Sequence, residues 1–179
     1  MKYVLASGLM GSGKTEISTY MANHLGFYRV HPGTIRDTVY ANLHFNDQKL
    51  EAALRSHILT HAVMIAESAL EEGKDVVIEN EALKNRTKHR LLDGVDSADV
   101  KKYWIILDAD TETRIKRVIE RPKGFGRGLN PEQVKELVYG DMAQWEEPDL
   151  LEGVEIIRYR NENGRDLENI KRDLGRRFR

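Results

Sequence analysis

The sequence contains no cysteine, only four prolines and no long apolar run. The absence of cysteine excludes disulfides, thiolate metal sites and cysteine nucleophiles. No stretch approaches the roughly 20 apolar residues of a membrane span, and Met1–Ala6 is too short for the apolar core of a signal peptide, so we expect a soluble cytoplasmic protein. An excess of charge of one sign is also lacking, because 28 Lys and Arg residues balance 29 Asp and Glu residues. The chain therefore lacks the overall basic excess expected of a dedicated nucleic-acid binder.

The sequence does have the length and apolar content of one globular domain, with 179 residues of which 40% are hydrophobic. Short β-branched runs alternate with longer helical patterns, which predicts an α/β fold with a five-stranded parallel sheet and helices on both faces. The expected strands are Tyr3–Ala6, Tyr28–Val30, Asp75–Glu79, Lys102–Leu107 and Val154–Tyr159. The expected helices are Lys14–Leu25, Asp47–Glu72, Asn85–Leu92, Thr111–Glu120, Pro131–Ala143 and Arg165–Arg177. We expect a single domain over residues 1–179.

Residues 8–15 read GLMGSGKT and match the spacing G-x-x-x-x-G-K-T. This segment follows an apolar strand and opens an amphipathic helix, which is the context of a Walker A phosphate-binding loop. Loop N–H groups converge on phosphate oxygens in such a site, Lys14 reaches the β- and γ-phosphates, and the Thr15 hydroxyl binds magnesium. The expected cofactor-binding residues are Gly8, Gly11, Ser12, Gly13, Lys14 and Thr15. The motif predicts a three-layer P-loop NTPase fold that binds ATP and Mg²⁺, because a glycine turn that only caps a helix needs neither Lys14 nor Thr15.

A second signal is the apolar run DVVIE, which ends at Glu79. Ligands of open α/β sheets collect at the carboxyl ends of the strands, so Glu79 should emerge beside the phosphate loop. Its carboxylate could orient Mg²⁺ through water molecules or accept a proton from the attacking hydroxyl. The alternative is a strand-end acid that only caps the following turn.

A third signal is a basic run between positions 114 and 127, in which a single acid, Glu120, accompanies six basic residues. It continues into the glycine-rich segment RPKGFGRGLN, which is a poor helix former. We expect an Arg-rich lid over approximately residues 121–143, and guanidinium groups there would stabilise the transferring phosphoryl group. The candidate arginines are Arg117, Arg121 and Arg127. A solvated helix face is the alternative, and the acidic stretch 141–155 is expected to avoid phosphate backbones.

These motifs together resemble the small P-loop kinases typified by the kinase domain of phage polynucleotide kinase, a group that includes zeta toxins and nucleoside-modifying kinases. GLMGSGKT is similar to their Walker A loop, and FYRVHPGTIRDTVY is similar to their segment after the first helix. DVVIENEALKNRTKHR resembles their second strand-turn-helix unit. The resemblance implies five parallel strands, a lid, ATP as the phosphate donor and a hydroxyl acceptor, which is often the 5′ end of a nucleic acid.

The same resemblance places Arg36 at the position of the arginine that binds the acceptor-side phosphate. Glu81 and Arg86 are the further candidates for acceptor binding. The sequence departs from the family at its general base, because Gly33 stands where the family has Asp. Asp37 and Glu79 are equal candidates for the missing carboxylate, with Glu81 and His31 as further ones. Phosphoryl transfer has a loose transition state that depends on positioning and electrostatics more than on a strong base.

The expected activity is therefore transfer of the ATP γ-phosphate to a hydroxyl of a nucleic acid or nucleotide, either a 5′-hydroxyl end or a hydroxymethylated base in phage-type DNA. A free nucleoside, a nucleotide or another small molecule is the alternative acceptor, because near-neutral charge does not demand a polymer. A non-catalytic nucleotide-binding switch is the alternative from a different class. No membrane partner and no particular oligomeric state is predicted.

Overall fold

The computed structural model describes residues 1–39, 48–95, 99–121 and 129–179, and within these ranges it leaves the side chains of residues 36, 37, 39 and 48–52 undescribed. Its sheet has five strands in the order β2-β3-β1-β4-β5, and every neighbouring pair is parallel. The strands are β1 (Lys2–Ser7), β2 (Tyr28–Val30), β3 (Val76–Asn80), β4 (Lys101–Asp108) and β5 (Val154–Arg160). The predicted five-stranded parallel sheet is thus confirmed, with β1 at its centre.

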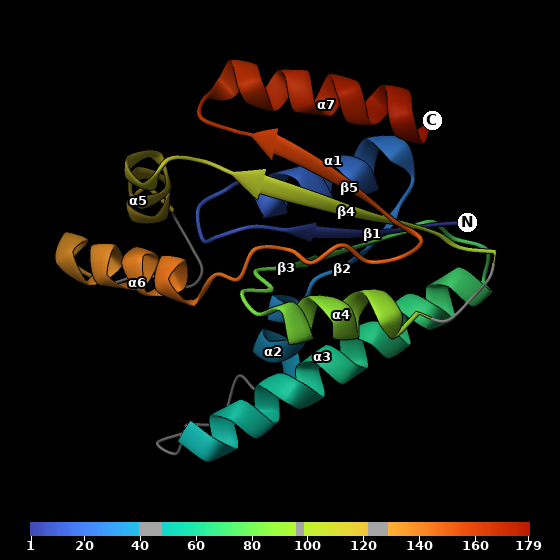
Figure 1. The fold of residues 1–179 in the computed structure, drawn as a ribbon, viewed down its shortest axis with the longest axis horizontal. Coiled ribbons are helices and arrows are strands. Elements are labelled where there is room, and N and C mark those ends of the chain that lie inside the picture. The colour runs from blue at the N-terminus through green and yellow to red at the C-terminus, as the bar shows by residue number, and fades with distance from the viewer. Residues whose placement is uncertain (40–47, 96–98, 122–128) are drawn as a thin grey trace.

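Helices cover both faces of this sheet, as predicted. Figure 1 shows α1 and α7 on one face and α3 and α4 on the other, while α5 and α6 lie beyond the carboxyl ends of the strands. The helices are α1 (Lys14–Leu25), α2 (Pro32–Val39), α3 (Gln48–Glu71), α4 (Asn85–Asp93), α5 (Thr111–Ile119), α6 (Pro131–Gln144) and α7 (Gly164–Phe178). The short helix α2 was not predicted. Within the described ranges, no helix combines the length and the apolar character that a membrane span requires.

The core divides into two clusters because successive side chains of a strand point to opposite faces of the sheet. Tyr3 and Leu5 of β1 pack in the cluster that includes Leu91 of α4. Val4 of β1 packs on the other face, with Ile17 of α1. The central strand is therefore apolar on both faces, as expected of a parallel sheet between two helical layers.

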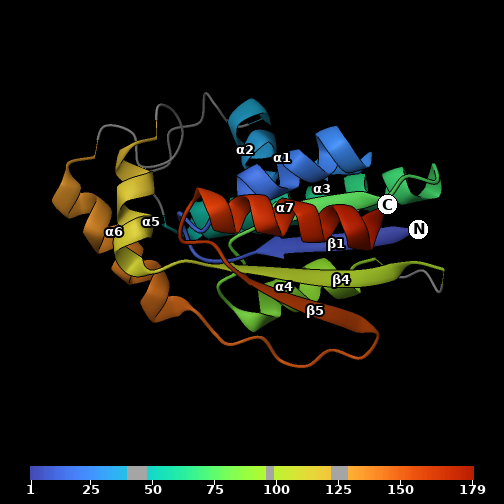
Figure 2. The same cartoon turned by 90° about the horizontal axis from the view of Figure 1, so that it is seen from above.

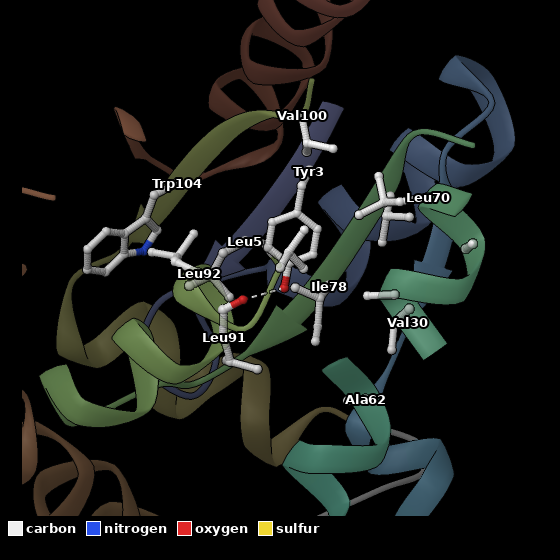
Figure 3. Close-up of a cluster of buried hydrophobic side chains, with 14 of the residues drawn as sticks. Tyr3, Leu5, Val30, Ala62, Leu70, Ile78, Leu91, Leu92, Val100 and Trp104 are labelled. Carbon is white, nitrogen blue, oxygen red and sulfur yellow. Dashed lines mark hydrogen bonds between the residues drawn. The ribbon is translucent and has the colours of Figure 1, made fainter. Parts of the chain in front are cut away.

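The large aromatic side chains of the first cluster also satisfy their polar groups. The Tyr3 hydroxyl donates a hydrogen bond to the Leu91 carbonyl oxygen at 2.7 Å, which Figure 3 shows inside the cluster. The Trp104 indole Nε1 donates to the Ser7 hydroxyl at 2.7 Å. The polar groups of buried Tyr and Trp side chains need such partners, because a buried polar group without a hydrogen bond costs stability. Both bonds connect different elements, so they fix β1 against α4 and β4.

A third, smaller cluster holds α5 and α6 at the carboxyl edge of the sheet, where Figure 2 shows the two helices side by side. Its buried residues are Met10, Val118, Val134 and Val138. Met10 belongs to the loop between β1 and α1, so this loop packs directly against the α5–α6 pair. The carboxyl edge is thereby closed on one side by helices that belong to neither main layer.

Candidate functional site

The segment between β1 and α1 forms a tight loop, and its glycines permit that geometry. Gly8, Gly11 and Gly13 have φ angles of 148°, 83° and 102°, in the region that side-chain-bearing residues rarely adopt. A Cβ atom on Gly8 would lie 2.1 Å from the Leu107 carbonyl oxygen of β4. Glycine is therefore needed at position 8 both for the backbone angle and for the close approach of β4. The loop leads straight into the first turn of α1, and N–H groups at the N-terminus of a helix attract anions.

Lys14, the first residue of α1, is 9% exposed and folds back over the loop. Its Nζ donates to the Leu9 carbonyl oxygen at 3.0 Å. Burial lowers the pKa of Lys14, while the nearby carboxylates of Glu81 and Glu79 act to raise it. The ammonium group is thus held beside the loop, with the neutral Leu9 carbonyl as its hydrogen-bond acceptor. An anion bound in the loop could compete for this group.

Glu79, in β3, is 3% exposed and has several polar partners among the described residues. Thr15 Oγ1 donates to its Oε1 at 2.9 Å, and the Ser18 hydroxyl donates to its Oε2. Arg29 Nη2 lies 3.0 Å from the same Oε2. His31 Nε2 lies 3.1 Å from Oε1. The predicted neighbourhood of Glu79 and Thr15 is therefore present, and it also includes three residues that the sequence did not link to Glu79.

These partners set the charge of Glu79. Burial alone would raise the pKa of its carboxyl, but His31, Ser18 and Arg29 together hold the pKa below its ordinary value. Glu79 is therefore an anion at neutral pH and a weak proton acceptor. This environment favours the metal-orienting role over the role of general base, the two functions that the sequence left open.

Thr15 and Glu79 offer the hard oxygen donors that Mg²⁺ prefers. Among the residues that the structure describes, no group of three or more His, Cys, Asp or Glu side chains is placed to hold a metal ion. Mg²⁺ does not require one, because it is commonly bound through one or two protein oxygens, substrate phosphates and water. The residues present fit a magnesium ion that is shared with a nucleotide.

The two described arginines of the predicted lid have different surroundings. Arg117 Nη1 donates to the Gly11 carbonyl oxygen at 3.3 Å and to the Asn161 carbonyl oxygen at 2.8 Å, so it holds the loop from outside. Arg121 is exposed, and its charge lowers the pKa of Lys14, which places it toward the phosphate loop. Arg127 lies outside the described residues. Arg117 therefore supports the phosphate loop in this structure.

An open cavity of about 520 Å³ extends from the phosphate loop along α1. Arg117 and Arg121 form part of its wall, and Lys171 contributes from α7. The remaining lining residues are Gly11, Gly13, Thr15, Glu16, Thr19, Tyr20, Asn23 and His24. Those from α1 recur at helical spacing and share one face of the helix. The cavity is continuous with the loop that is predicted to bind phosphate.

A family comparison agrees with this geometry. The family model described as "AAA domain" matches residues 4–148. The chain belongs to this AAA-domain family. The match runs from β1 through α6 and includes both the phosphate loop and Glu79. No curated protein matches the sequence.

Solved structures that share the fold of this AAA-domain protein include kinases. A sugar kinase from Janibacter superposes with a TM-score of 0.67 at 20% identity, covering 98% of this chain and 93% of that chain. Shikimate kinase from Bacteroides thetaiotaomicron gives 0.63 at 11% identity, with coverage of 98% and 97%. Kti12 from Chaetomium thermophilum, in complex with ADP-AlF3, gives 0.57 at 14% identity, with both chains fully covered at 100%. At these identities the likeness shows the fold alone, and it confirms a P-loop kinase-type fold. The narrower resemblance to polynucleotide kinases stays a prediction.

Two further carboxylates, besides that of Glu79, lie near Lys14 in this AAA-domain protein. Glu81 follows β3 and Asp141 lies in α6, and both carboxylates are close enough to Lys14 to act on its pKa. Burial and the charge of Glu81 raise the pKa of Asp141 to about 6, against the lowering effect of Lys14 and Arg114. Asp141 Oδ2 is buried and has no hydrogen-bond partner among the described residues.

Asp141 was not predicted as a site residue, and the acidic stretch that begins with it was expected to lie away from phosphate. A signal was nevertheless present in α6. Val134, Val138 and Asp141 follow each other at helical spacing, and the two valines are buried. Asp141 therefore lies on the inward face of α6, in contrast to the exposed residues that follow it.

The residues predicted to bind the acceptor are only partly described. The side chains of Arg36 and Asp37, both in α2, lie outside the described part of the structure. Glu81 is half-buried beside Lys14, whereas Arg86 is exposed on α4. The position of the family Asp is informative: a Cβ atom on Gly33 would lie 2.9 Å from His31 Nε2. The imidazole that contacts Glu79 thus occupies the space beside Gly33.

Proposed function

We propose that this protein is an ATP-dependent kinase that transfers the γ-phosphate to a hydroxyl group of a small molecule. The observation that carries the proposal is the convergence of Lys14, Thr15 and Glu79 at a glycine loop that opens a helix. Phosphoryl transfer requires a cation, a hydroxyl that can bind a metal and a metal-orienting carboxylate at one anion-binding loop. A loop that only connected β1 to α1 would need none of these side chains.

In the proposed enzyme, the backbone N–H groups of the loop bind the phosphate oxygens. The loop residues involved are Gly8, Gly11, Ser12 and Gly13. Lys14 exchanges the Leu9 carbonyl for the β- and γ-phosphates, and Arg121 adds positive charge from the lid side. Thr15 and Glu79 would hold Mg²⁺, the Thr15 hydroxyl as a ligand and the Glu79 carboxylate by orienting water ligands. A bound metal would supply positive charge that neutralises the phosphates.

The acceptor is proposed to be a small molecule with several hydroxyl groups, because Glu81 and Asp141, two carboxylates, lie next to Lys14. Carboxylates bind the hydroxyl groups of a polyol through hydrogen bonds, whereas they repel the phosphates of a nucleic acid. With its raised pKa, Asp141 is the better proton acceptor for an attacking hydroxyl. Asp37 and Arg36 keep their proposed roles at the acceptor. The names of the sugar kinase and the shikimate kinase, which share the fold, support this choice.

The test is phosphate transfer from labelled ATP, with Mg²⁺, to a panel of acceptors. The panel contains sugars, gluconate, shikimate, free nucleosides, 5′-hydroxyl oligonucleotides and duplex DNA with hydroxymethyluracil. We expect label in one of the small molecules, and Lys14→Ala should abolish it. Lys74→Ala is the matched control, because Lys74 is exposed and lies at the opposite end of β3.

Other outcomes would replace the proposal. Label on the oligonucleotide end or on the modified base would select the nucleic-acid kinase implied by the family resemblance. Tight ATP binding without transfer to water or to any acceptor would indicate a nucleotide-binding switch. Absence of ATP binding by the wild-type protein would contradict the kinase assignment itself.

A further inference from the structure

The outward-facing carbonyl groups of the phosphate loop need donors of their own. When successive N–H groups of a loop turn toward an anion, carbonyl groups of the same peptides turn away from it. Two such carbonyls have donors here. The Ser12 carbonyl oxygen accepts a hydrogen bond from Asn161 Nδ2 at 2.9 Å, and the Gly11 carbonyl oxygen accepts one from Arg117 Nη1 at 3.3 Å.

Asn161, which directly follows β5, is held in place from several sides. Its backbone N–H donates to the Asp108 carbonyl oxygen at 2.8 Å, at the end of β4. Its own carbonyl oxygen accepts from Arg117 at 2.8 Å. The residue is 2% exposed. The side-chain amide that supports Ser12 therefore belongs to a residue whose backbone is anchored to β4, β5 and α5.

Packing confirms that the amide fits closely against the loop. A Cβ atom on Gly13 would lie 2.4 Å from Asn161 Nδ2, so glycine at position 13 leaves the space that the amide fills. Asn161 Oδ1 is buried and has no partner among the described residues. An amide with one end unsatisfied costs stability. The side chain is thus oriented to donate to the Ser12 carbonyl oxygen, although this orientation leaves its Oδ1 without a partner among the described residues.

We propose that Asn161 is a positioning residue for the phosphate site: it orients the Ser12 carbonyl so that the following N–H groups of the loop face a bound phosphate. The inference rests on the proposed function, because it assumes that the loop binds nucleotide. Asn161 does not touch the nucleotide in this arrangement. It acts through the loop backbone, and Arg117 supports the neighbouring carbonyl in the same way.

The test compares ATP affinity and thermal stability in three variants by calorimetry. Asn161→Ala removes the donor to Ser12, and we expect about a tenfold loss of affinity for Mg²⁺-ATP, the size of one lost hydrogen bond. Asn163→Ala is the matched control, because Asn163 caps α7 two residues further on, where its side chain accepts hydrogen bonds from the backbone N–H groups of Arg165 and Asp166. It should lower the melting temperature with less than about a twofold change in affinity.

Asn161→Asp supplies a second readout with nearly the same shape as the native side chain. A carboxylate cannot donate to Ser12 and adds negative charge near the phosphates. We expect a larger loss of affinity than for Asn161→Ala, and part of it should return at high salt, because salt screens the added charge. A residue with only a structural role would lower the melting temperature without lowering the affinity for Mg²⁺-ATP. This variant also serves if Asn161→Ala does not fold.

The proposal is overturned if Asn161→Ala and Asn161→Asp bind ATP as tightly as Asn163→Ala. Wild-type protein and Lys14→Ala, measured in parallel, separate this failure from failure of the proposed function. If the wild type binds ATP and Lys14→Ala does not, then unchanged affinity in the Asn161 variants contradicts only the positioning role. If the wild type does not bind ATP, the proposed function itself fails.

Discussion

Two carboxylates flank the phosphate loop, and their surroundings are opposite. Glu79 is buried among Thr15, Ser18, Arg29 and His31, which keep its pKa below the ordinary value. Asp141, in α6, has one oxygen without a hydrogen-bond partner among the described residues and a pKa raised to about 6. The first environment stabilises a permanent anion, whereas the second favours a group that takes up and releases a proton. The comparison teaches that two carboxylates beside one P-loop can have pKa values shifted in opposite directions, because their hydrogen-bond donors and neighbouring charges differ.

The largest expected effect is on Glu79. Glu79→Ala removes a buried carboxylate and leaves the partly exposed Arg29 without its ion-pair partner, and we expect the free energy of unfolding to fall by about 3 kcal/mol. Urea denaturation measures this loss. Glu72→Ala is the control, since Glu72 is 60% exposed in its ion pair with Lys74 and surface pairs contribute little. An equal loss in both variants would show that Glu79 is no better partnered than a surface acid.

The pH dependence of this loss has a definite sign. Because the pKa of Glu79 is lowered by folding, its stabilising contribution is complete above the ordinary carboxyl pKa. The contribution disappears as the pH falls through the folded-state pKa. The difference between wild type and Glu79→Ala should therefore shrink only under acidic conditions.

Asp141→Asn should have the opposite sign and a smaller size. Folding raises the pKa of Asp141 from 3.8 to about 6, so its ionisation opposes folding increasingly as the pH rises through this interval and to the full extent above it. Allowing for its partial exposure, we expect Asp141→Asn to stabilise the nucleotide-free protein by about 1 kcal/mol near neutral pH, and by little below the ordinary pKa. Unfolding curves across this pH range measure the difference. Destabilisation at neutral pH would mean that the Asp141 anion is well partnered.

The smallest expected effect concerns the link between Glu81 and Asp141. The charge of Glu81 helps to raise the pKa of Asp141, so Glu81→Gln should move that pKa from about 6 toward its ordinary value. A carboxyl titration followed by NMR reports the shift. Glu147→Gln is a suitable control because Glu147 is 74% exposed and pairs with Arg158 instead. An unchanged Asp141 pKa in Glu81→Gln would show that burial alone raises it.

Much of the fold was predictable because the signals were local. The β-branched runs and the helical patterns gave five strands and six helices close to their observed bounds, and the glycine spacing located the phosphate loop. The helix α2 (Pro32–Val39) was missed because it is short and begins with Pro-Gly, a pair that reads as a turn. Its proline occupies the first helical position, where the missing N–H has no cost.

The candidate site was predictable only where chemistry and sequence spacing coincide. Lys14, Thr15 and Glu79 follow from the motif and from the end of a strand. Asn161 supports the loop across 149 residues of sequence, and no local pattern reveals such a contact. Arg117 was predicted as a lid arginine. Its hydrogen bonds to the carbonyl oxygens of Gly11 and Asn161 could not be predicted, because the acceptor that a guanidinium group contacts depends on tertiary packing.

The most direct test of the central claim is the affinity of the wild-type protein and of Lys14→Ala for Mg²⁺-ATP, measured by calorimetry. Lys14 lies folded over the loop, and its ammonium group would otherwise remain with a neutral carbonyl. We expect tight binding by the wild type and about a hundredfold weaker binding by Lys14→Ala, as for loss of a charge-assisted contact to phosphate. Equal affinities would contradict the conclusion that this loop holds a nucleotide.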